Sequence, residues 1–338
     1  MQKAKFVLSK SKVIEQYEKI KQMSDVVSYS SKTNQEITKI LEKETDSLFS
    51  VHFETELKHV KDLSRVIFLA QAWNETKIRN LMSKGITKFI VDNESDLDQL
   101  LNLKDIKVEM LLLRTKLKEN SIRTEKYFVF GMNYETINKR IKELKNKANK
   151  IGIHFHRKTQ NMSEWNLQYE IENMFSDDTL NLIDFINIGG GIPTVYANTN
   201  VKVFDSIFKK IKEFHSWLKN KNIKMIIEPG RFIAAPSIEL HTKIIGIDEK
   251  NIVVNASVYN SDLDALVVPV KLLIKNEKEN GIPYVIKGFT PCSLDLFRYK
   301  VYLNNPQIGD SIIFLNAGAY NFHSDFCDLE KIETEVIE

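Results

Sequence analysis

Eight short apolar runs recur between residues 26 and 230, and stretches with helical spacing of apolar residues separate most of them. Each run is almost continuously apolar, which is typical of a parallel strand covered on both faces. The segment 203–220 shows the separating pattern clearly, with Val203, Ile207 and Ile211 on one helical face. Eight strand-then-helix units predict an α/β fold, a (β/α)8 barrel. Its strands are expected at 26–32, 47–51, 65–70, 88–92, 108–114, 150–156, 185–191 and 225–230.

The pattern changes after residue 236, where apolar stretches follow one another with only short polar turns between them. Such runs without helical spacing predict a second, C-terminal β-rich domain. Its strands are expected within 238–247, 251–258, 266–274, 284–288 and 310–320. We therefore predict an N-terminal strand and helix over 1–24, a barrel over 25–235 and the β-rich domain over 236–338. The first strand, within 3–10, is expected to join the C-terminal sheet.

Charge and cysteine content narrow the class of partner. Forty-eight basic residues against 45 acidic ones leave a net charge of +3, too balanced for a nucleic-acid or membrane surface. The two cysteines, Cys292 and Cys327, do not make a disulfide framework. The first residues lack the apolar core of a signal peptide, and no run reaches membrane-spanning length. We expect a cytoplasmic protein that acts on a small molecule, without nucleic acid or membrane.

Chemically useful side chains follow several of the predicted barrel strands. In a (β/α)8 barrel the active site lies at the carboxyl ends of the strands, so these side chains are expected on one face. Each has a plainer alternative: a surface lysine, a core histidine, a structural ion pair, or a tight turn at the three glycines. Their joint placement favours a site. The residues are Lys32, Arg114, His154, His156, Gly189, Gly190, Gly191, Glu228 and Arg231.

One cofactor requires this whole set of groups. Pyridoxal 5′-phosphate needs a lysine amine, an acid beside its pyridine nitrogen, a flat group against its ring and a cradle for its phosphate. Backbone N–H groups of consecutive glycines form such anion cradles.

The sequence resembles the fold-type III pyridoxal-phosphate decarboxylases, which share an alanine racemase-like fold. This family includes ornithine, arginine, diaminopimelate and carboxynorspermidine decarboxylases, and the resemblance covers essentially the whole chain. The segments "EPGR", "GGG" and "AGAY" in this order are a specific signal. The motifs that carry the resemblance are "YSSKTN", "GIHFHRKTQ", "INIGGGIP", "IIEPGRF", "FTPCSLDLF" and "NAGAYNF".

The resemblance implies a role for each motif residue. Lys32 is the Schiff-base lysine, His156 stacks on the cofactor ring, and Glu228 faces the pyridine nitrogen. Cys292 is the implied proton donor, reaching in from the other subunit of a homodimer with composite active sites. The remaining cofactor-binding residues are Arg114, Thr159, Gly189, Gly190, Gly191, Arg231 and Tyr320, most of them around the phosphate.

Three departures from the family pattern bear on the substrate and the site. Arg157 and Lys158 stand where the family has glycine, and they are expected to add positive charge near the phosphate loop. Cys292 takes the role of the family cysteine only with a shift of one residue. The aspartate that binds a distal amine is not clearly present, and Asp262, Asp264 or Asp295 could replace it.

The expected reaction is therefore decarboxylation of an α-amino acid other than plain ornithine. A carboxylated polyamine and an aminocarboxypropyl group on a larger intermediate are both candidates for the substrate. An amino-acid racemase of the same fold is an alternative, although such racemases place an arginine beside the pyridine nitrogen, where this chain has Glu228. A catalytically dead regulatory homologue is another, disfavoured because Lys32, His156 and Tyr320 are all retained.

Overall fold

The structure is a computed structural model that describes residues 3–117, 129–321 and 324–338. Its internal contacts divide the chain into two compact units. The barrel unit comprises Tyr17–Pro193 and Lys202–Gly230. The sheet unit comprises the chain up to Gln16, Thr194–Val201 and Arg231–Glu338. The chain thus leaves the barrel unit twice, once just after the three glycines and once just after the "EPG" segment.

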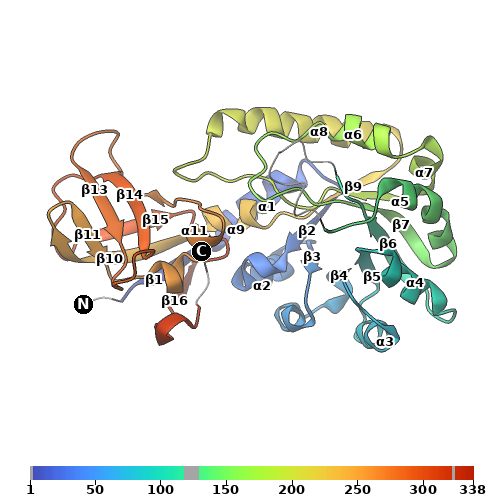
Figure 1. The fold of residues 1–338 in the computed structure, drawn as a ribbon, viewed down its shortest axis with the longest axis horizontal. Helices are drawn as coiled ribbons and strands as arrows, with labels where there is room; N and C mark the ends of the chain where they lie inside the picture. Colours follow the sequence, from blue (N-terminus) through green and yellow to red (C-terminus); the bar gives the residue numbers. More distant parts are fainter. Residues whose placement is uncertain (1–2, 118–128, 322–323) are drawn as a thin grey trace. The chain divides into compact units, whose positions relative to one another are not determined.

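The barrel unit is built on a closed barrel of eight parallel strands, which are labelled β2 to β9 in Figure 1. Each strand pairs with the next in sequence, and the last pairs with the first through Val26–Ile226 and Val27–Ile227. The predicted (β/α)8 barrel is therefore confirmed. The strands are β2 (Val26–Ser30), β3 (Leu48–Val51), β4 (Val66–Ala70), β5 (Lys88–Val91), β6 (Val108–Arg114), β7 (Ala148–His154), β8 (Phe185–Asn187) and β9 (Lys224–Ile227).

Helices connect these strands on the outside of the barrel (Figure 1). Several begin at an asparagine whose side chain accepts a first-turn N–H, as at Asn34, Asn74 and Asn93. Inside the barrel, buried apolar side chains from strands all around it form one cluster that includes Ile67, Leu112 and Ile226. The helices are α1 (Lys10–Lys21, which begins in the sheet unit), α2 (Gln35–Glu44), α3 (Glu75–Ser83), α4 (Glu94–Asn102), α5 (Tyr134–Arg140), α6 (Leu167–Met174), α7 (Asp177–Leu182) and α8 (Phe204–Asn220).

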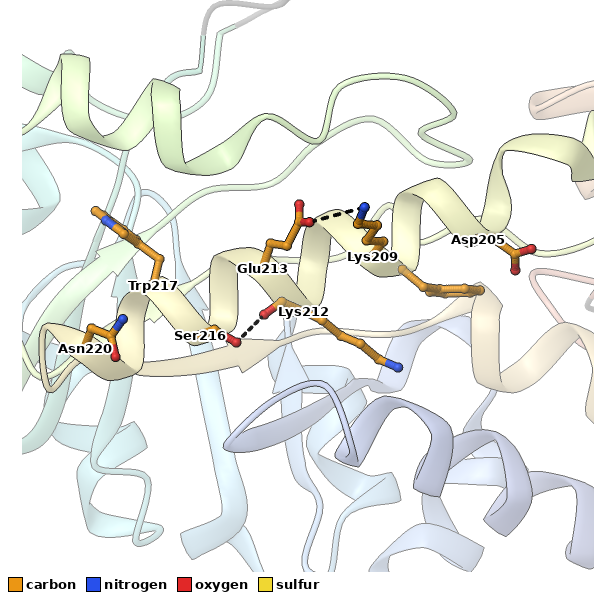
Figure 2. A pocket seen from close by; sticks show the side chains of 8 residues that line it. Asp205, Lys209, Lys212, Glu213, Ser216, Trp217 and Asn220 are labelled. Atoms are coloured by element: carbon orange, nitrogen blue, oxygen red, sulfur yellow. Dashed lines mark hydrogen bonds and ion pairs between the residues drawn. The ribbon is translucent and has the colours of Figure 1, made fainter.

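Helix α8 shows how the predicted amphipathic pattern is used. Ile207, Ile211 and Leu218 are buried, as their helical spacing predicts. The outer face carries a surface hollow in which Lys209 and Glu213 form an ion pair of 3.8 Å, shown in Figure 2. All residues lining this hollow belong to α8, so it is separate from the carboxyl ends of the barrel strands. Within the described residues, no helix is both long and apolar enough to cross a membrane.

The sheet unit contains an eight-stranded mixed sheet ordered β12-β15-β10-β11-β13-β14, with β1 paired to β10 and β16 paired to β1. Strand β1 pairs antiparallel with β10 and parallel with β16. The β-rich character predicted for the C-terminal part is confirmed. The strands are β1 (Lys5–Ser9), β10 (Ile238–Asp248), β11 (Asn251–Val254), β12 (Leu273–Ile274), β13 (Pro283–Lys287), β14 (Leu296–Tyr302), β15 (Ser311–Leu315) and β16 (Glu333–Ile337).

Two details of this unit differ from the sequence prediction. Most of 266–274 is not a strand, because Asp264–Val267 forms the short helix α11 and only Leu273–Ile274 pairs in the sheet. Pro269 between them has no N–H for a sheet ladder, which explains the late start of the strand. Strands β14 and β16 were not predicted: β14 alternates poorly, and every side chain of β16 is exposed. The other short helices are α9 (Arg231–Ala234) and α10 (Val258–Ser261).

Candidate active site

The carboxyl ends of the barrel strands bring together the predicted polar residues of the barrel unit. Lys32 lies in a 3₁₀ turn directly after β2, and Glu228 directly follows β9. Strand β7 ends at His154, two residues before His156. The glycines follow β8 after a single residue, Ile188. Because all eight strands are parallel, these residues lie at one end of the barrel.

Glu228 is held by side chains from three other barrel strands. Its buried carboxylate accepts hydrogen bonds at Oε1 from Ser50 Oγ (2.8 Å) and Asn187 Nδ2 (2.9 Å). His154 Nε2 lies 3.4 Å from the other oxygen, Oε2. Burial alone would raise the pKa of Glu228, but the hydrogen bonds from His154, Asn187 and Ser50 outweigh burial and lower it. The group is therefore a carboxylate at neutral pH.

His154 supports that charge without carrying one. Its side chain is completely buried, and burial lowers its pKa even though the neighbouring Glu228 opposes the shift. A neutral ring that faces a carboxylate must hold its proton on the facing nitrogen, so Nε2–H donates to Glu228. His154 Nδ1 has no hydrogen-bond partner within the described part of the chain. The arrangement leaves one negative charge in a buried, hydrogen-bonded setting.

His156 is held in a defined tautomer by the glycine loop. The Gly190 N–H donates to His156 Nδ1 over 3.1 Å, so a neutral ring carries its proton on Nε2. The ring is exposed on one side, yet the surrounding protein and the charge of Arg114 lower its pKa. An uncharged, flat ring is thus presented at the end of the barrel.

The three glycines are required by close approach of neighbouring atoms. Gly189 and Gly191 have φ of +63° and +91°, in the region that favours glycine. A Cβ at Gly190 would lie 2.8 Å from the Glu228 carbonyl oxygen and 3.2 Å from His156 Cε1. The Gly189 N–H donates to Asn187 Oδ1 over 2.9 Å. The loop is therefore packed against both Glu228 and His156, and two of its N–H groups are used in holding it there.

Lys32 combines exposure at the barrel end with a lowered pKa. The protein around it lowers the pKa of its amine, while Glu56 and Glu228 act in the opposite direction. Glu56 is held in place because its Oε1 accepts the N–H groups of His52 (3.2 Å) and Phe53 (3.1 Å). A lysine must lose its proton to act as a nucleophile, so a lowered pKa favours that role.

The remaining barrel residues differ in their contacts. Arg114, at the end of β6, pairs with Asp92 at 3.0 Å. Thr159 lies exposed in the loop after β7. The expected extra positive charge near the glycines is not found as such, because the buried Arg157 guanidinium pairs with Glu170 at 2.6 Å. Glu164 lies 3.4 Å from Arg157 and 3.6 Å from Lys158, so nearby carboxylates balance both cations.

In the sheet unit, Arg231 is the centre of a second polar cluster. Its buried guanidinium forms a two-pronged ion pair with Asp264, and its Nη1 also donates a hydrogen bond to the Tyr196 hydroxyl over 3.0 Å. The guanidinium carbon also lies 5.1 Å from the centre of the Tyr320 ring and 5.7 Å from that of Tyr196. Arg231, Asp264 and Tyr320, three of the predicted site residues, are therefore brought together.

Asp262 lies close to this cluster in sequence but has a different setting. It is completely buried, and neither carboxylate oxygen has a hydrogen-bond partner among the residues that the structure describes. Burial raises its pKa well above the ordinary value, and the nearby Asp264 adds to the shift. A buried carboxylate without a donor favours its neutral form or a cationic partner.

Asp295 and Cys292 form part of a loop whose carboxylate is already used. Asp295 Oδ1 accepts the Val258 N–H (2.9 Å), and Oδ2 accepts from both Thr290 N–H (3.1 Å) and Thr290 Oγ1 (2.6 Å). Asp295 therefore holds this loop together. Cys292 has a free, partly exposed thiol, and its carbonyl accepts the Asp295 N–H over 3.0 Å.

Sequence reasoning missed two residues that hold Glu228. Ser50 and Asn187 are single polar residues at or near the ends of apolar strand segments, "SLFSV" and "FIN". A polar side chain at the carboxyl end of a barrel strand is a signal for the active-site face. That signal could have found both residues, although it does not reveal that their shared partner is Glu228.

Comparison with known proteins identifies relatives of the barrel unit. The sequence model for the pyridoxal binding domain of pyridoxal-dependent decarboxylases matches residues 10–235. A probable ornithine decarboxylase of Dictyostelium discoideum is 26% identical over 166 residues, which are 42% of this chain. Diaminopimelate decarboxylase of Buchnera aphidicola is 30% identical over 161 residues, or 41% of this chain. These matches span 35% and 38% of the two relatives, respectively.

Solved structures resemble the fold over its whole length. Lysine/ornithine decarboxylase from Vibrio vulnificus, complexed with cadaverine, has a TM-score of 0.79 at 23% identity. That likeness covers 99% of this chain and 94% of the other. Arginine decarboxylase of Paramecium bursaria Chlorella virus has a TM-score of 0.77 at 21% identity, covering 100% and 97% of the two chains. At these identities the likeness shows a shared fold and nothing more specific.

Proposed function

This chain belongs to the pyridoxal-dependent decarboxylase family, and we propose that it removes the α-carboxylate of an amino acid with pyridoxal 5′-phosphate as cofactor. The observation that carries the proposal is the buried, ionised Glu228 at the same barrel end as Lys32. A carboxylate in this position favours a protonated pyridine nitrogen, which a decarboxylase needs as an electron sink. Among the described hydrogen bonds of the site, no arginine occupies the position of Glu228, where a racemase of this fold would have one.

The residues of the barrel end fit the cofactor. Lys32 offers an exposed amine of lowered pKa for covalent attachment to the cofactor aldehyde. A Cβ at Gly190 would meet the Glu228 carbonyl oxygen and the His156 ring, so the glycine lets the loop pack against two residues that we assign to the cofactor. With Lys32 holding it and Glu228 beside its pyridine nitrogen, bound pyridoxal phosphate would supply the electron sink that decarboxylation needs.

Each protein group has a distinct task in this proposal. Glu228 stabilises positive charge at the pyridine nitrogen, since its own pKa is lowered and it stays ionised. His156 is neutral, so its flat ring can lie against a positively charged ring without repulsion. Gly191, Thr159 and Arg114 are assigned to the cofactor by the family resemblance. In the sheet unit, Arg231 and Tyr320 are assigned to the phosphate on the same ground.

For the substrate we propose an amino acid whose distal part carries a positive charge. Asp262 supports this, because a buried carboxylate without a hydrogen-bond donor gains most from a cationic partner. Asp264 and Asp295 are less suited, since Arg231 and the Thr290 loop already occupy their oxygens. A carboxylated polyamine meets this description, and an aminocarboxypropyl group on a larger intermediate meets it where that intermediate carries a cation.

The function is tested by measuring carbon dioxide release from a panel of carboxyl-labelled substrates. The panel should hold ornithine, lysine, arginine, diaminopimelate and a carboxylated polyamine, each with wild type and with Lys32→Ala. Release above the Lys32→Ala background from any of them supports a decarboxylase. Inversion of the α-carbon without carbon dioxide release would instead indicate a racemase and overturn the proposal.

We further propose a homodimer in which Cys292 donates a proton in the active site of the partner subunit. The partly exposed, free thiol supports this role, and free cysteines suit a reducing cytoplasm. Lys32→Ala and Cys292→Ala should each be nearly inactive. After subunit exchange at equal loading, half of the dimers carry one intact site, so about a quarter of the wild-type activity should return. A mixture that stays inactive despite proven exchange would place Cys292 and Lys32 in the same site of one chain.

A further inference from the structure

Asn187, the last residue of β8, hydrogen-bonds to two different parts of the barrel end. Its Nδ2–H donates to Glu228 Oε1 over 2.9 Å, and its Oδ1 accepts the Gly189 N–H over 2.9 Å. The side chain is completely buried, so water does not compete for either bond. We propose that Asn187 is a positioning residue that couples the glycine loop to Glu228. The phosphate end and the pyridine end of the cofactor site would then respond as one unit.

The orientation of the Asn187 amide follows from its two partners. A carboxylate has no proton to donate, and a backbone N–H has no lone pair to offer. The amide nitrogen must therefore face Glu228, and the amide oxygen must face Gly189. Rotation of the amide by 180° would break both bonds at once. This makes the side chain a rigid connection between the two groups rather than a contact with one of them.

A main-chain bond joins the same two segments. The Glu228 N–H donates to the Gly189 carbonyl oxygen over 2.8 Å. The backbone therefore fixes the separation of the two segments, while Asn187 fixes the orientation of the Glu228 carboxyl group relative to the loop. Asn187 and Ser50 occupy Oε1, and among the described residues the only hydrogen-bond partner of Oε2 is His154, at 3.4 Å. Oε2 is thus the oxygen with remaining capacity for a charged N–H donor.

Ser50 provides a matched control for this idea. Its Oγ donates to the same Glu228 oxygen at 2.8 Å, and it is equally buried. Its other side-chain contact is with Ser28 Oγ at 2.8 Å, on the neighbouring strand β2. Ser50 therefore supports Glu228 without touching the glycine loop. Removal of Ser50 and removal of Asn187 should have the same effect on Glu228 but different effects on the loop.

The inference rests on the proposed function, because it assumes that the loop binds the phosphate of pyridoxal phosphate. Two measurements separate the two ends of the site. The first is the dissociation constant of inorganic phosphate from the apoenzyme. The second is the nitrogen-15 chemical shift of ¹⁵N-labelled pyridoxal phosphate in the holoenzyme, which reports protonation of the pyridine nitrogen. Both are made on wild type, Asn187→Leu and Ser50→Ala, with thermal melting to verify folding.

Asn187→Leu should weaken phosphate binding on the order of tenfold, because the Gly189 N–H loses its acceptor. It should also move the nitrogen-15 shift toward that of an unprotonated pyridine. Ser50→Ala should change the nitrogen-15 shift alone. If Asn187→Leu does not fold, Asn187→Ala is measured in the same way, since its smaller side chain leaves the packing of β8 less strained.

Coupling is overturned if the folded Asn187 variant keeps wild-type phosphate affinity, or if its two readouts match those of Ser50→Ala. Failure of the proposed function gives a different result. In that case wild type itself would bind no pyridoxal phosphate, or would hold it with an unprotonated nitrogen.

Discussion

Two buried carboxylates, one in each unit, have opposite surroundings. Glu228 in the barrel unit accepts hydrogen bonds from Ser50 and Asn187 and faces His154, and its pKa is lowered. Asp262 in the sheet unit has no hydrogen-bond partner among the described residues, and its pKa is raised. Burial is nearly the same for both, so the difference comes from the donors around them.

This difference separates two kinds of function. A carboxylate surrounded by donors keeps its charge and position whether or not a ligand is present, as the electronics of a cofactor require. A carboxylate without donors is costly to ionise and becomes stable as an anion only when a cation binds. Under the proposed function, Glu228 in the barrel unit would serve the cofactor, and Asp262 in the sheet unit would serve substrate selection.

Among the substitutions in the barrel unit, we expect Lys32→Ala to cause the largest loss of activity. We expect roughly a thousandfold loss of activity or more, because the residue that attaches the cofactor is removed. The absorbance band of the attached cofactor should disappear as well. Lys39→Ala is the matched control, since Lys39 is an exposed lysine of α2 that pairs with Glu36. Equal loss in both variants would argue for a general effect of removing charge.

Glu228→Gln tests the fixed charge itself. Loss of one charged hydrogen bond costs roughly 1.5–3 kcal/mol, so turnover should fall more than about tenfold. The cofactor should still bind, because Lys32 and the glycine loop are untouched. Steady-state kinetics together with cofactor content measure this split. Full turnover in the variant would mean that a residue other than Glu228 stabilises the protonated pyridine nitrogen.

Gly190→Ala tests the close approach of the loop. The added Cβ would lie 2.8 Å from a carbonyl oxygen of Glu228, so the loop must move. Cofactor affinity should fall by at least about tenfold, or ~1.4 kcal/mol of binding free energy. Gly246→Ala serves as control, because there the nearest atom to a new Cβ is 3.8 Å away. Titration of apoenzyme with cofactor gives both values, and unchanged affinity in Gly190→Ala would contradict a role for this loop.

The smallest expected effect concerns the pH dependence of stability at Asp262. Its pKa is raised in the folded state, so the stability it contributes is complete below the ordinary carboxyl pKa and is lost as the pH rises. Asp262→Asn cannot ionise and avoids this loss. The melting temperature of the variant relative to wild type should therefore rise between pH 4 and pH 7.5. A loss of roughly 1 kcal/mol corresponds to about 2–4 °C in a domain of this size.

Asp264→Asn sharpens that comparison. Its removal leaves the buried Arg231 without its ion-pair partner, so we expect a lower melting temperature at both pH values. For Asp262→Asn, the contradicting result is a melting-temperature difference from wild type that stays constant across the same pH range. That result would mean that Asp262 already has a partner.

The sequence predicts the barrel well because its signal is periodic and repeated eight times. Buried parallel strands are apolar whatever their neighbours are, so 26–32 or 108–114 can be recognised without knowledge of the fold. The residues Lys32, His156 and Glu228 were found because each lies within a distinctive motif at a strand end. The two strands that were missed, β14 and β16, have side chains that follow no clear two-residue alternation.

What the sequence could not separate were residues of the same type with different partners. The sequence alone does not distinguish the settings of Asp262, Asp264 and Asp295. Their environments depend on donors distant in the chain, such as Val258 for Asp295 and Arg231 for Asp264. The same holds for Ser50, whose partner Glu228 is 178 residues away. Such pairings arise only when each unit folds and brings distant segments of the chain together.

The central claim is that this barrel end holds pyridoxal phosphate on Lys32. Borohydride reduction of the purified holoenzyme, followed by proteolysis and mass spectrometry, tests it most directly. We predict one peptide with a pyridoxyl group, the one that contains "YSSKTN", with the group on Lys32. A pyridoxyl group on another lysine, or none in protein saturated with cofactor, would contradict the account.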